Sequence, residues 1–158
     1  MPDQTLLLLL DEVRGKTLRI LDATPAEFAL RSPPGLRNHI LWYGGHSYVV
    51  VESLSMRALG REPEIPEGWF EIFSWDSRPA LVSPHRWPTL PEVVDRLRDQ
   101  HERLRGVIDD LSGEQLDRPS ADNPARTVRY AILHALHDEA GHLGEAYLLL
   151  KMQARERD

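Results

Sequence analysis

The sequence predicts an all-α protein, a four-helix bundle with a long crossover loop between the second and third long helices. Four stretches carry apolar residues at helical spacing, and they cover about residues 4–21, 36–59, 89–111 and 127–152. A short turn separates the helices within each pair, whereas a long irregular segment, 61–88, separates the two pairs. Residues 48–51 are β-prone but lie inside the second helical stretch, so no strand is expected. This paired pattern indicates a bundle whose halves are joined by a crossover connection.

Local signals mark where the helices begin and end. Residues 24–27 (TPAE) are a helix start with proline at the first helical position, which predicts a short turn after the first helix. Residues 32–35 (SPPG) end that turn, because prolines lack a backbone donor and glycine permits a turn. Residues 89–92 (TLPE) form a capping-box pattern at the start of the third helix, and residues 112–115 (SGEQ) begin a second short turn.

The segment 61–88 is rich in proline and tryptophan. It holds five of the twelve prolines and three of the four tryptophans. A loop of this length in a compact domain is unusual and is often functional. We expect its aromatic side chains to hold it against the bundle, and these are Trp69, Phe70, Phe73, Trp75 and Trp87.

Length and composition indicate one globular domain, residues 1–158. Apolar residues make up 41% of the chain and charged residues 28%, which is ordinary globular composition. The formal charge of -6 argues against nonspecific nucleic-acid binding, which needs a positive surface. The absence of cysteine excludes disulfides, thiolate ligands and a cysteine nucleophile. The run of five leucines at 6–10 is too short for a signal-peptide core or a membrane span, so we expect a cytoplasmic protein.

Histidine and aspartate side chains form a candidate divalent metal site. His134, Asp138 and His142 recur every four residues and therefore share one helix face. Asp138 and His142 have the spacing that chelates one ion, whereas His134 and His142 are about 12 Å apart along the helix, too far to bind it together. The third ligand must come from another helix. His46 is the best candidate, because it follows Gly44 and Gly45, which permit close approach of a neighbouring helix or a ligand. Two imidazoles and a carboxylate leave coordination positions open.

Other interpretations of these residues stay open. A helical histidine is more often a hydrogen-bonded core residue or a surface residue than a ligand. We interpret His39, His85 and His101 as surface or loop residues, and His137 as exposed or adjacent to a ligand. Glu12, Glu52 and Glu145 are either partners of the ligands or, more commonly for such residues, members of salt bridges or exposed to solvent. The arginines of the third helix alternate with acidic residues and indicate a solvated face, and they are Arg96, Arg98, Arg103 and Arg105. No serine-nucleophile, Walker or dinucleotide-binding motif is present.

At these positions the sequence resembles the DinB-like superfamily. Residues 38–46 (NHILWYGGH) are similar to the family's second-helix signature, and residues 138–145 (DEAGHLGE) to its fourth-helix signature. Residues 87–94 (WPTLPEVV) and 111–119 (LSGEQLDRP) are similar to the start of its third helix and the turn that follows. The resemblance covers nearly the whole chain. One position departs from the family pattern, because Asp138 stands where a histidine is usual.

The resemblance implies a metal-binding protein whose ligands are His46, Asp138 and His142. It implies a divalent ion, zinc, nickel or iron, and the carboxylate moves the preference somewhat toward iron or manganese. The expected activity is that of a metal-dependent transferase or hydrolase that activates a low-molecular-weight thiol or water. The expected partners are a small-molecule substrate and a second copy of the chain. The alternative is a non-catalytic helical bundle that acts by dimerising or by binding a partner, with a structural or vestigial metal site.

Overall fold

The computed structural model describes residues 1–156, and residues 157–158 of the predicted domain lie outside the described part. It contains four long helices, α1 (Gln4–Asp22), α2 (Ile40–Ala58), α4 (Leu90–Asp109) and α6 (Val128–Arg155). The shorter helices are η1 (Ala26–Phe28), α3 (Trp69–Phe73), η2 (Pro79–Leu81), η3 (Pro84–Arg86) and α5 (Gly113–Leu116). No strand occurs in residues 1–156, where the one β-bridge joins Pro119 to Thr127. The all-α prediction is therefore confirmed.

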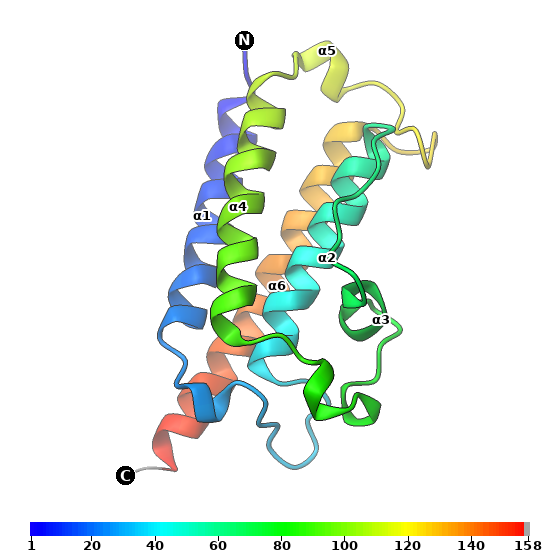
Figure 1. The fold of residues 1–158 in the computed structure, drawn as a ribbon. Coiled ribbons are helices and arrows are strands. Elements are labelled where there is room, and N and C mark those ends of the chain that lie inside the picture. The colour runs from blue at the N-terminus through cyan, green and yellow to red at the C-terminus, as the bar shows by residue number, and fades with distance from the viewer. Residues whose placement is uncertain (157–158) are drawn as a thin grey trace.

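The long helices pack side by side as a bundle (Figure 1). Both α4 and α6 pack against α1 and against α2, so α1 and α2 occupy opposite corners. In Figure 1, α1 and α6 run downward and α2 and α4 run upward. Because α2 and α4 run in the same direction, the chain must return along the bundle between them, and residues 59–89 make this return.

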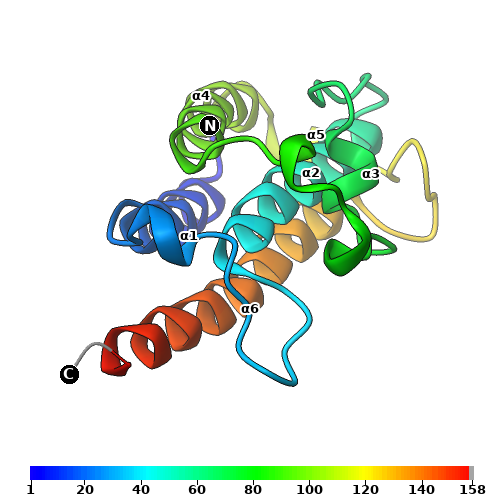
Figure 2. The same cartoon turned by 60° about the horizontal axis from the view of Figure 1, so that its bottom comes forward.

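The returning segment is less irregular than its proline content predicts, because it carries α3, η2 and η3. Figure 2 shows α3 on the outer side of α2, away from α1. The crossover therefore adds a layer to the bundle on the side of α2.

Helix α2 starts at Ile40, four residues later than the sequence predicts. His39 is the N-cap residue: its backbone is extended, with φ -109° and ψ 169°, and its Nδ1 accepts a hydrogen bond from the N–H of Trp42 at 3.0 Å. His39 lies in the loop before α2, as one of its two interpretations has it, but it is not a surface residue, because only 6% of it is exposed. Histidine is not among the favoured N-cap residues, which is why the pattern placed the start too early.

The two capping patterns of the sequence behave as predicted. Thr89 accepts from the N–H of Glu92, and the Glu92 carboxylate accepts from the N–H of Thr89 at 2.6 Å. Ser112 and Gln115 make the same reciprocal pair at the start of α5. The predicted turn at residues 24–27 is the 3₁₀ helix η1. Side-chain caps satisfy the free backbone donors of a helix start, so these short motifs fix the starts of α4 and α5 locally.

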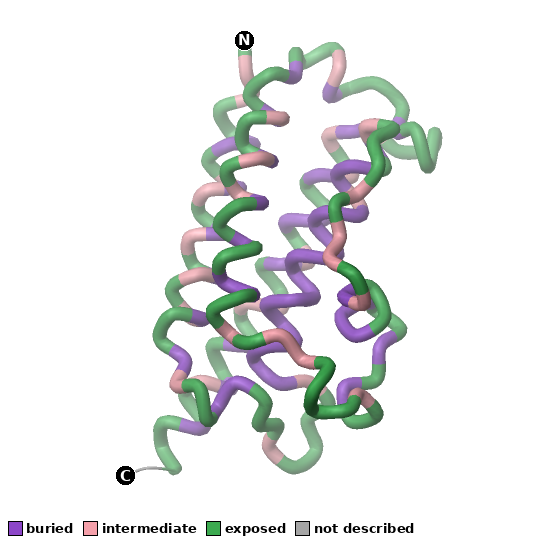
Figure 3. The backbone as a smooth tube through the Cα atoms, in the orientation of Figure 1, coloured by how far each residue is buried: buried purple, intermediate pink, exposed green. Residues whose placement is uncertain are grey.

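The interior consists of two apolar clusters with a polar layer between them. Helix α2 is buried along almost its whole length (Figure 3). In the polar layer, Arg14 and Glu139 are fully buried and bind each other through two contacts of 2.9 Å. Arg14 also donates to the Leu97 carbonyl at 2.8 Å and to Gln100 at 2.9 Å, and Gln100 donates to Glu52 on α2 at 2.9 Å. One hydrogen-bonded network thus joins all four long helices.

Gly45 lets α3 lie directly against α2. A Cβ atom on Gly45 would stand 2.3 Å from the Phe73 ring, so no larger residue fits without displacement. Phe73 and Trp69 are buried, and they hold the segment on the bundle as predicted. The prediction is wrong for Phe70 and Trp75, which are 38% and 51% exposed. These two rings contact each other at the surface, with 5.7 Å between their centroids.

None of the helices described for residues 1–156 combines the length and apolarity needed to span a bilayer.

Candidate metal centre

The structure brings together the three predicted ligand residues from two antiparallel helices. His46 lies on α2, and Asp138 and His142 lie one turn apart on the facing side of α6. One ligand atom from each lies within 4.8 Å of the others. The Asp138 Oδ2 atom is 3.5 Å from His46 Nε2 and 3.7 Å from His142 Nε2. Among residues 1–156, this is the group of histidine and acidic side chains that has the geometry of a metal site.

The backbone of α3 fixes the orientation of His46. Its Nδ1 lies 2.6 Å from the carbonyl oxygen of Phe73. A carbonyl can only accept, so Nδ1 carries the proton and donates it, which leaves the lone pair of Nε2 facing Asp138. The Trp42 ring stacks on the imidazole at 4.2 Å and 17°, and the histidine is 3% exposed. A metal-binding histidine is typically held in this way, through its second nitrogen.

The Asp138 oxygen that faces the two imidazoles lacks another partner. Asp138 Oδ2 is buried without a hydrogen-bond partner. Burial raises the pKa of this carboxyl, but the neighbouring imidazoles of His46, His142 and His134 lower it more. The pKa of Asp138 therefore lies below the usual value for an aspartate. Two imidazole nitrogens and one carboxylate oxygen therefore converge on one point. Two ligands of a tetrahedral metal with bonds of 2.0–2.2 Å lie about 3.4 Å apart, so the 3.5 and 3.7 Å separations suit a divalent cation.

The second nitrogen of His142 faces a group on its own helix. His142 Nδ1 lies 3.5 Å from Glu145 Oε1, one turn further along α6. The Tyr43 ring packs against the imidazole at 5.4 Å. Burial raises the pKa of the Tyr43 hydroxyl, and its hydrogen bond to the Glu145 carboxylate raises it further. Glu145 thus lies behind a predicted ligand, which was one of the roles expected for it, whereas no sequence signal pointed to Tyr43.

The centre opens on one side to solvent. The side chains of Asp138 and His142 are 32% and 23% exposed, whereas that of His46 is 4% exposed. Trp42 and Phe73 close the inner wall behind His46. An ion bound here would keep coordination positions toward solvent, which is the arrangement of catalytic rather than structural metal sites.

The remaining histidines do not belong to this group of ligand atoms. His134, His137 and His85 are not buried, and His134 stacks on Tyr130 at 5.8 Å. His101 is only half-buried and pairs with Asp11 at 2.8 Å.

Two of the predicted acidic partners of the ligands belong to other interactions. Glu12 pairs with Lys16 on the surface of α1. Glu52 is buried and pairs with Arg103 of α4 at 2.8 Å. The arginines of α4 therefore do not all belong to a solvated face, because Arg103 turns toward this buried carboxylate.

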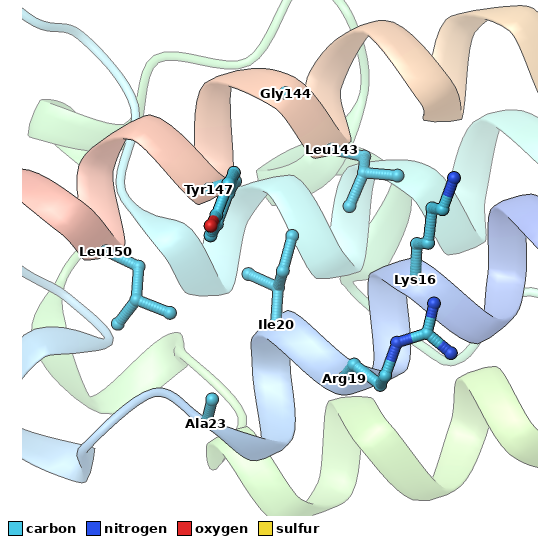
Figure 4. A pocket seen from close by; sticks show the side chains of 8 residues that line it. All are labelled: Lys16, Arg19, Ile20, Ala23, Leu143, Gly144, Tyr147 and Leu150. Carbon is cyan, nitrogen blue, oxygen red and sulfur yellow. The ribbon is translucent and has the colours of Figure 1, made fainter.

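A separate apolar groove lies on the other side of α6. It has a volume of about 370 Å³ between α1 and α6, with Ile20, Leu143 and Leu150 on its floor (Figure 4). Gly144 contributes no side chain to it, and Lys16 and Arg19 stand at its edge (Figure 4). The three predicted ligands do not line this groove.

Comparison with known families shows to which family the chain is related. The family model for the DinB superfamily matches residues 9–146. The chain belongs to the DinB superfamily. That match reaches all four long helices and includes all three residues of the centre, so the resemblance predicted from the sequence is confirmed.

Structural comparison supports the fold of this DinB protein. The crystal structure of the conserved protein of locus from Enterococcus faecalis is similar, with a TM-score of 0.74 over 96% of each chain. The two sequences are 16% identical, so this likeness concerns the fold alone. No curated protein matches the sequence significantly.

Proposed function

We propose that this DinB protein binds one divalent metal ion at His46, Asp138 and His142 and uses it in a transferase or hydrolase reaction. The observation that carries the proposal is the convergence of three ligand atoms around an unpartnered carboxylate oxygen at a solvent-facing point of the bundle. A bound divalent ion acts as a Lewis acid that makes a coordinated water or thiol a better nucleophile near neutral pH. The donor set of two imidazoles and one carboxylate suits zinc, nickel or iron.

Each residue of the centre has a distinct part in this proposal. His46 presents Nε2 because the Phe73 carbonyl holds its Nδ1 proton. Asp138 supplies the one negative charge, which offsets part of the cation's charge and makes a bound water a weaker acid than in a three-histidine site. Glu145 lies 3.5 Å from His142 Nδ1, and its negative charge favours the tautomer with the proton on Nδ1 and a free Nε2. Trp42 covers the inner face and keeps water from it.

The substrate side of the proposal rests on the open face of the centre. A low-molecular-weight thiol or water would reach the ion past Asp138 and His142, the two more exposed ligands. The expected homodimer belongs to the same proposal and is supported by exposed apolar side chains on α6, which include Tyr147, Leu148 and Met152. Sedimentation of the protein over a range of concentrations tests the dimer independently of activity.

Metal content and thiol reactivity together test the proposal. Protein purified without a histidine tag should contain or take up one divalent ion per chain, and the loaded protein should accelerate the reaction of a small thiol with an electrophile such as 1-chloro-2,4-dinitrobenzene. The matched control is His85→Ala, which changes an exposed histidine outside the centre. A protein that binds no metal contradicts the whole proposal. A protein that binds metal but is inert toward thiols and esters supports the non-catalytic alternative.

A further inference from the structure

A second cavity lies at the end of the bundle where α2 begins. It is formed between the segment before α2 and the segment that carries η2 and η3, which meet at the lower end of the molecule in Figure 1. Its volume is about 390 Å³, within the range of small-molecule sites. The walls are mainly apolar and include Leu30, Leu36, Pro79 and Trp87. Three polar side chains, Ser32, Arg37 and His39, stand among them.

His39 lines this cavity and carries a ring N–H donor. Its Nδ1 accepts from the N–H of Trp42, so the ring proton must sit on Nε2. Only 6% of the residue is exposed, and its ring packs edge-on against the Trp87 ring, with 4.7 Å between the ring centroids. No described residue accepts a hydrogen bond from Nε2. Burial lowers the pKa of this imidazole to about 4, so at neutral pH the ring is an uncharged donor. The Nε2–H is therefore free to donate to an acceptor in the cavity.

Arg37 supplies a positive charge at the same cavity. One guanidinium nitrogen donates to the backbone carbonyl of Ser77. No carboxylate among residues 1–156 forms an ion pair with it, although the chain carries an excess of acidic residues. The remaining N–H groups of Arg37 are free to bind an anion, and a guanidinium matches the geometry of a carboxylate.

We infer that this cavity binds a small molecule with an apolar body and a single carboxylate, held by Arg37 and by the Nε2–H of His39. The single cation fits one negative charge, and the neutral His39 adds a hydrogen bond without adding charge. The apolar walls exclude a highly charged ligand. Phosphorylated compounds are therefore poorer candidates than a monocarboxylate with an aromatic or aliphatic body.

This site is distinct from the metal centre. Trp42 lies between them, because its ring stacks on His46 while its Nε1–H donates to the Ser77 hydroxyl at 2.8 Å. None of the three metal-ligand candidates lines the cavity. The inference therefore does not rest on the proposed activity, and it is tested on metal-free protein.

Three matched compounds test the inference by calorimetry in the presence of EDTA. These are 4-phenylbutanoate, 4-phenylbutanamide and 4-phenylbutylamine, which share one apolar body and differ in charge. The wild-type protein should bind the carboxylate about ten-fold more tightly than the amide and should not bind the amine. Equal affinity for carboxylate and amide, or no binding of the carboxylate at millimolar concentration, overturns the inference.

Variants locate the binding. Arg37→Gln should remove the preference for carboxylate over amide, whereas Arg78→Gln, a neighbouring exposed arginine that does not line the cavity, should preserve it. Because Arg37 also holds the Ser77 carbonyl, its replacement could disturb the local structure, so a second variant changes a residue without such a contact. Ala80→Phe fills the cavity from an exposed position and should abolish binding of both compounds. Its control is Ala125→Phe at the opposite end of the bundle.

The groove between α1 and α6 is the competing place for such a ligand. It also combines an apolar floor with two cations (Figure 4). Gly144→Leu fills it, since a Cβ atom there meets nothing within 4 Å. Loss of binding in Gly144→Leu together with retained binding in Ala80→Phe would overturn the inference. Loss in Ala80→Phe with retention in Gly144→Leu supports it.

Discussion

Gly45→Ala is the substitution that most directly probes how α3 is held on the bundle. The new Cβ would lie 2.3 Å from Phe73 Cε1, whereas carbon atoms in contact lie about 3.5–4.0 Å apart. The Phe73 ring would have to move by more than about 1 Å, and it is fully buried. Overpacking of this kind costs about 1–3 kcal/mol. Alanine is favoured over glycine in a helix by about 1 kcal/mol, so the overpacking is expected to win.

The matched control has the opposite sign. Gly106 lies in α4, where an added methyl group would meet nothing within 4 Å, so Gly106→Ala should stabilise the protein by about 0.5–1 kcal/mol. Urea denaturation of both variants in EDTA measures the difference without any contribution from metal. Because the gain from alanine is common to both variants, we expect Gly45→Ala to be the less stable by the overpacking cost, about 1–3 kcal/mol. A Gly45→Ala protein as stable as Gly106→Ala would refute the assigned contact between α3 and α2.

Three further predictions concern single side chains. Asp138→Asn keeps the shape but removes the charge and should weaken metal binding about 10 to 100-fold, while Asp138→His should restore zinc or nickel affinity; metal titration showing equal affinity for wild type and Asp138→Asn would remove Asp138 from the ligands. Glu139→Gln leaves the buried Arg14 guanidinium without its counter-charge and should cost about 3–5 kcal/mol, measured by urea denaturation; a loss below about 1 kcal/mol would show that the pair is dispensable. The pKa of His39 is lowered from 6.5 to about 4 in the folded protein, so between these pH values the unfolded chain binds a proton that the folded chain does not. The contribution of His39 to the free energy of unfolding is therefore present above pH 6.5 and is lost as the pH falls toward 4, a change on the order of 3 kcal/mol. His39→Asn retains a capping side chain and should flatten that part of the stability profile, and an unchanged profile would contradict the assignment.

The fold was predictable because its signals are local. The positions of apolar residues predicted the four long helices, and the capping patterns at Thr89 and Ser112 predicted two helix starts almost to the residue. The start of α2 was placed too early because His39 caps through a ring nitrogen, which no common capping pattern includes. The end of α6 extends to Arg155, beyond the predicted end near residue 152, since the pattern of apolar residues fades before the helix does.

The centre was predictable only in part. The i and i+4 spacing on α6 pointed to Asp138 and His142, and the glycines before His46 indicated a close approach. The approaching element proved to be α3, whose Phe73 carbonyl orients His46. A backbone carbonyl leaves no mark in the sequence, so this contact was out of reach. The Arg14–Glu139 pair was missed for a similar reason, because 125 residues separate its members and nothing local distinguishes a buried arginine from a solvated one.

The central claim is that His46, Asp138 and His142 bind a metal ion, and metal stoichiometry tests it most directly. Tag-free wild-type protein, His46→Ala and His85→Ala are titrated with zinc, nickel and ferrous iron by calorimetry and then analysed for bound metal after gel filtration. We predict one ion per chain in the wild type and in His85→Ala, and no stoichiometric ion in His46→Ala. Retention of one ion per chain by His46→Ala, or its absence from the wild type, would contradict the claim.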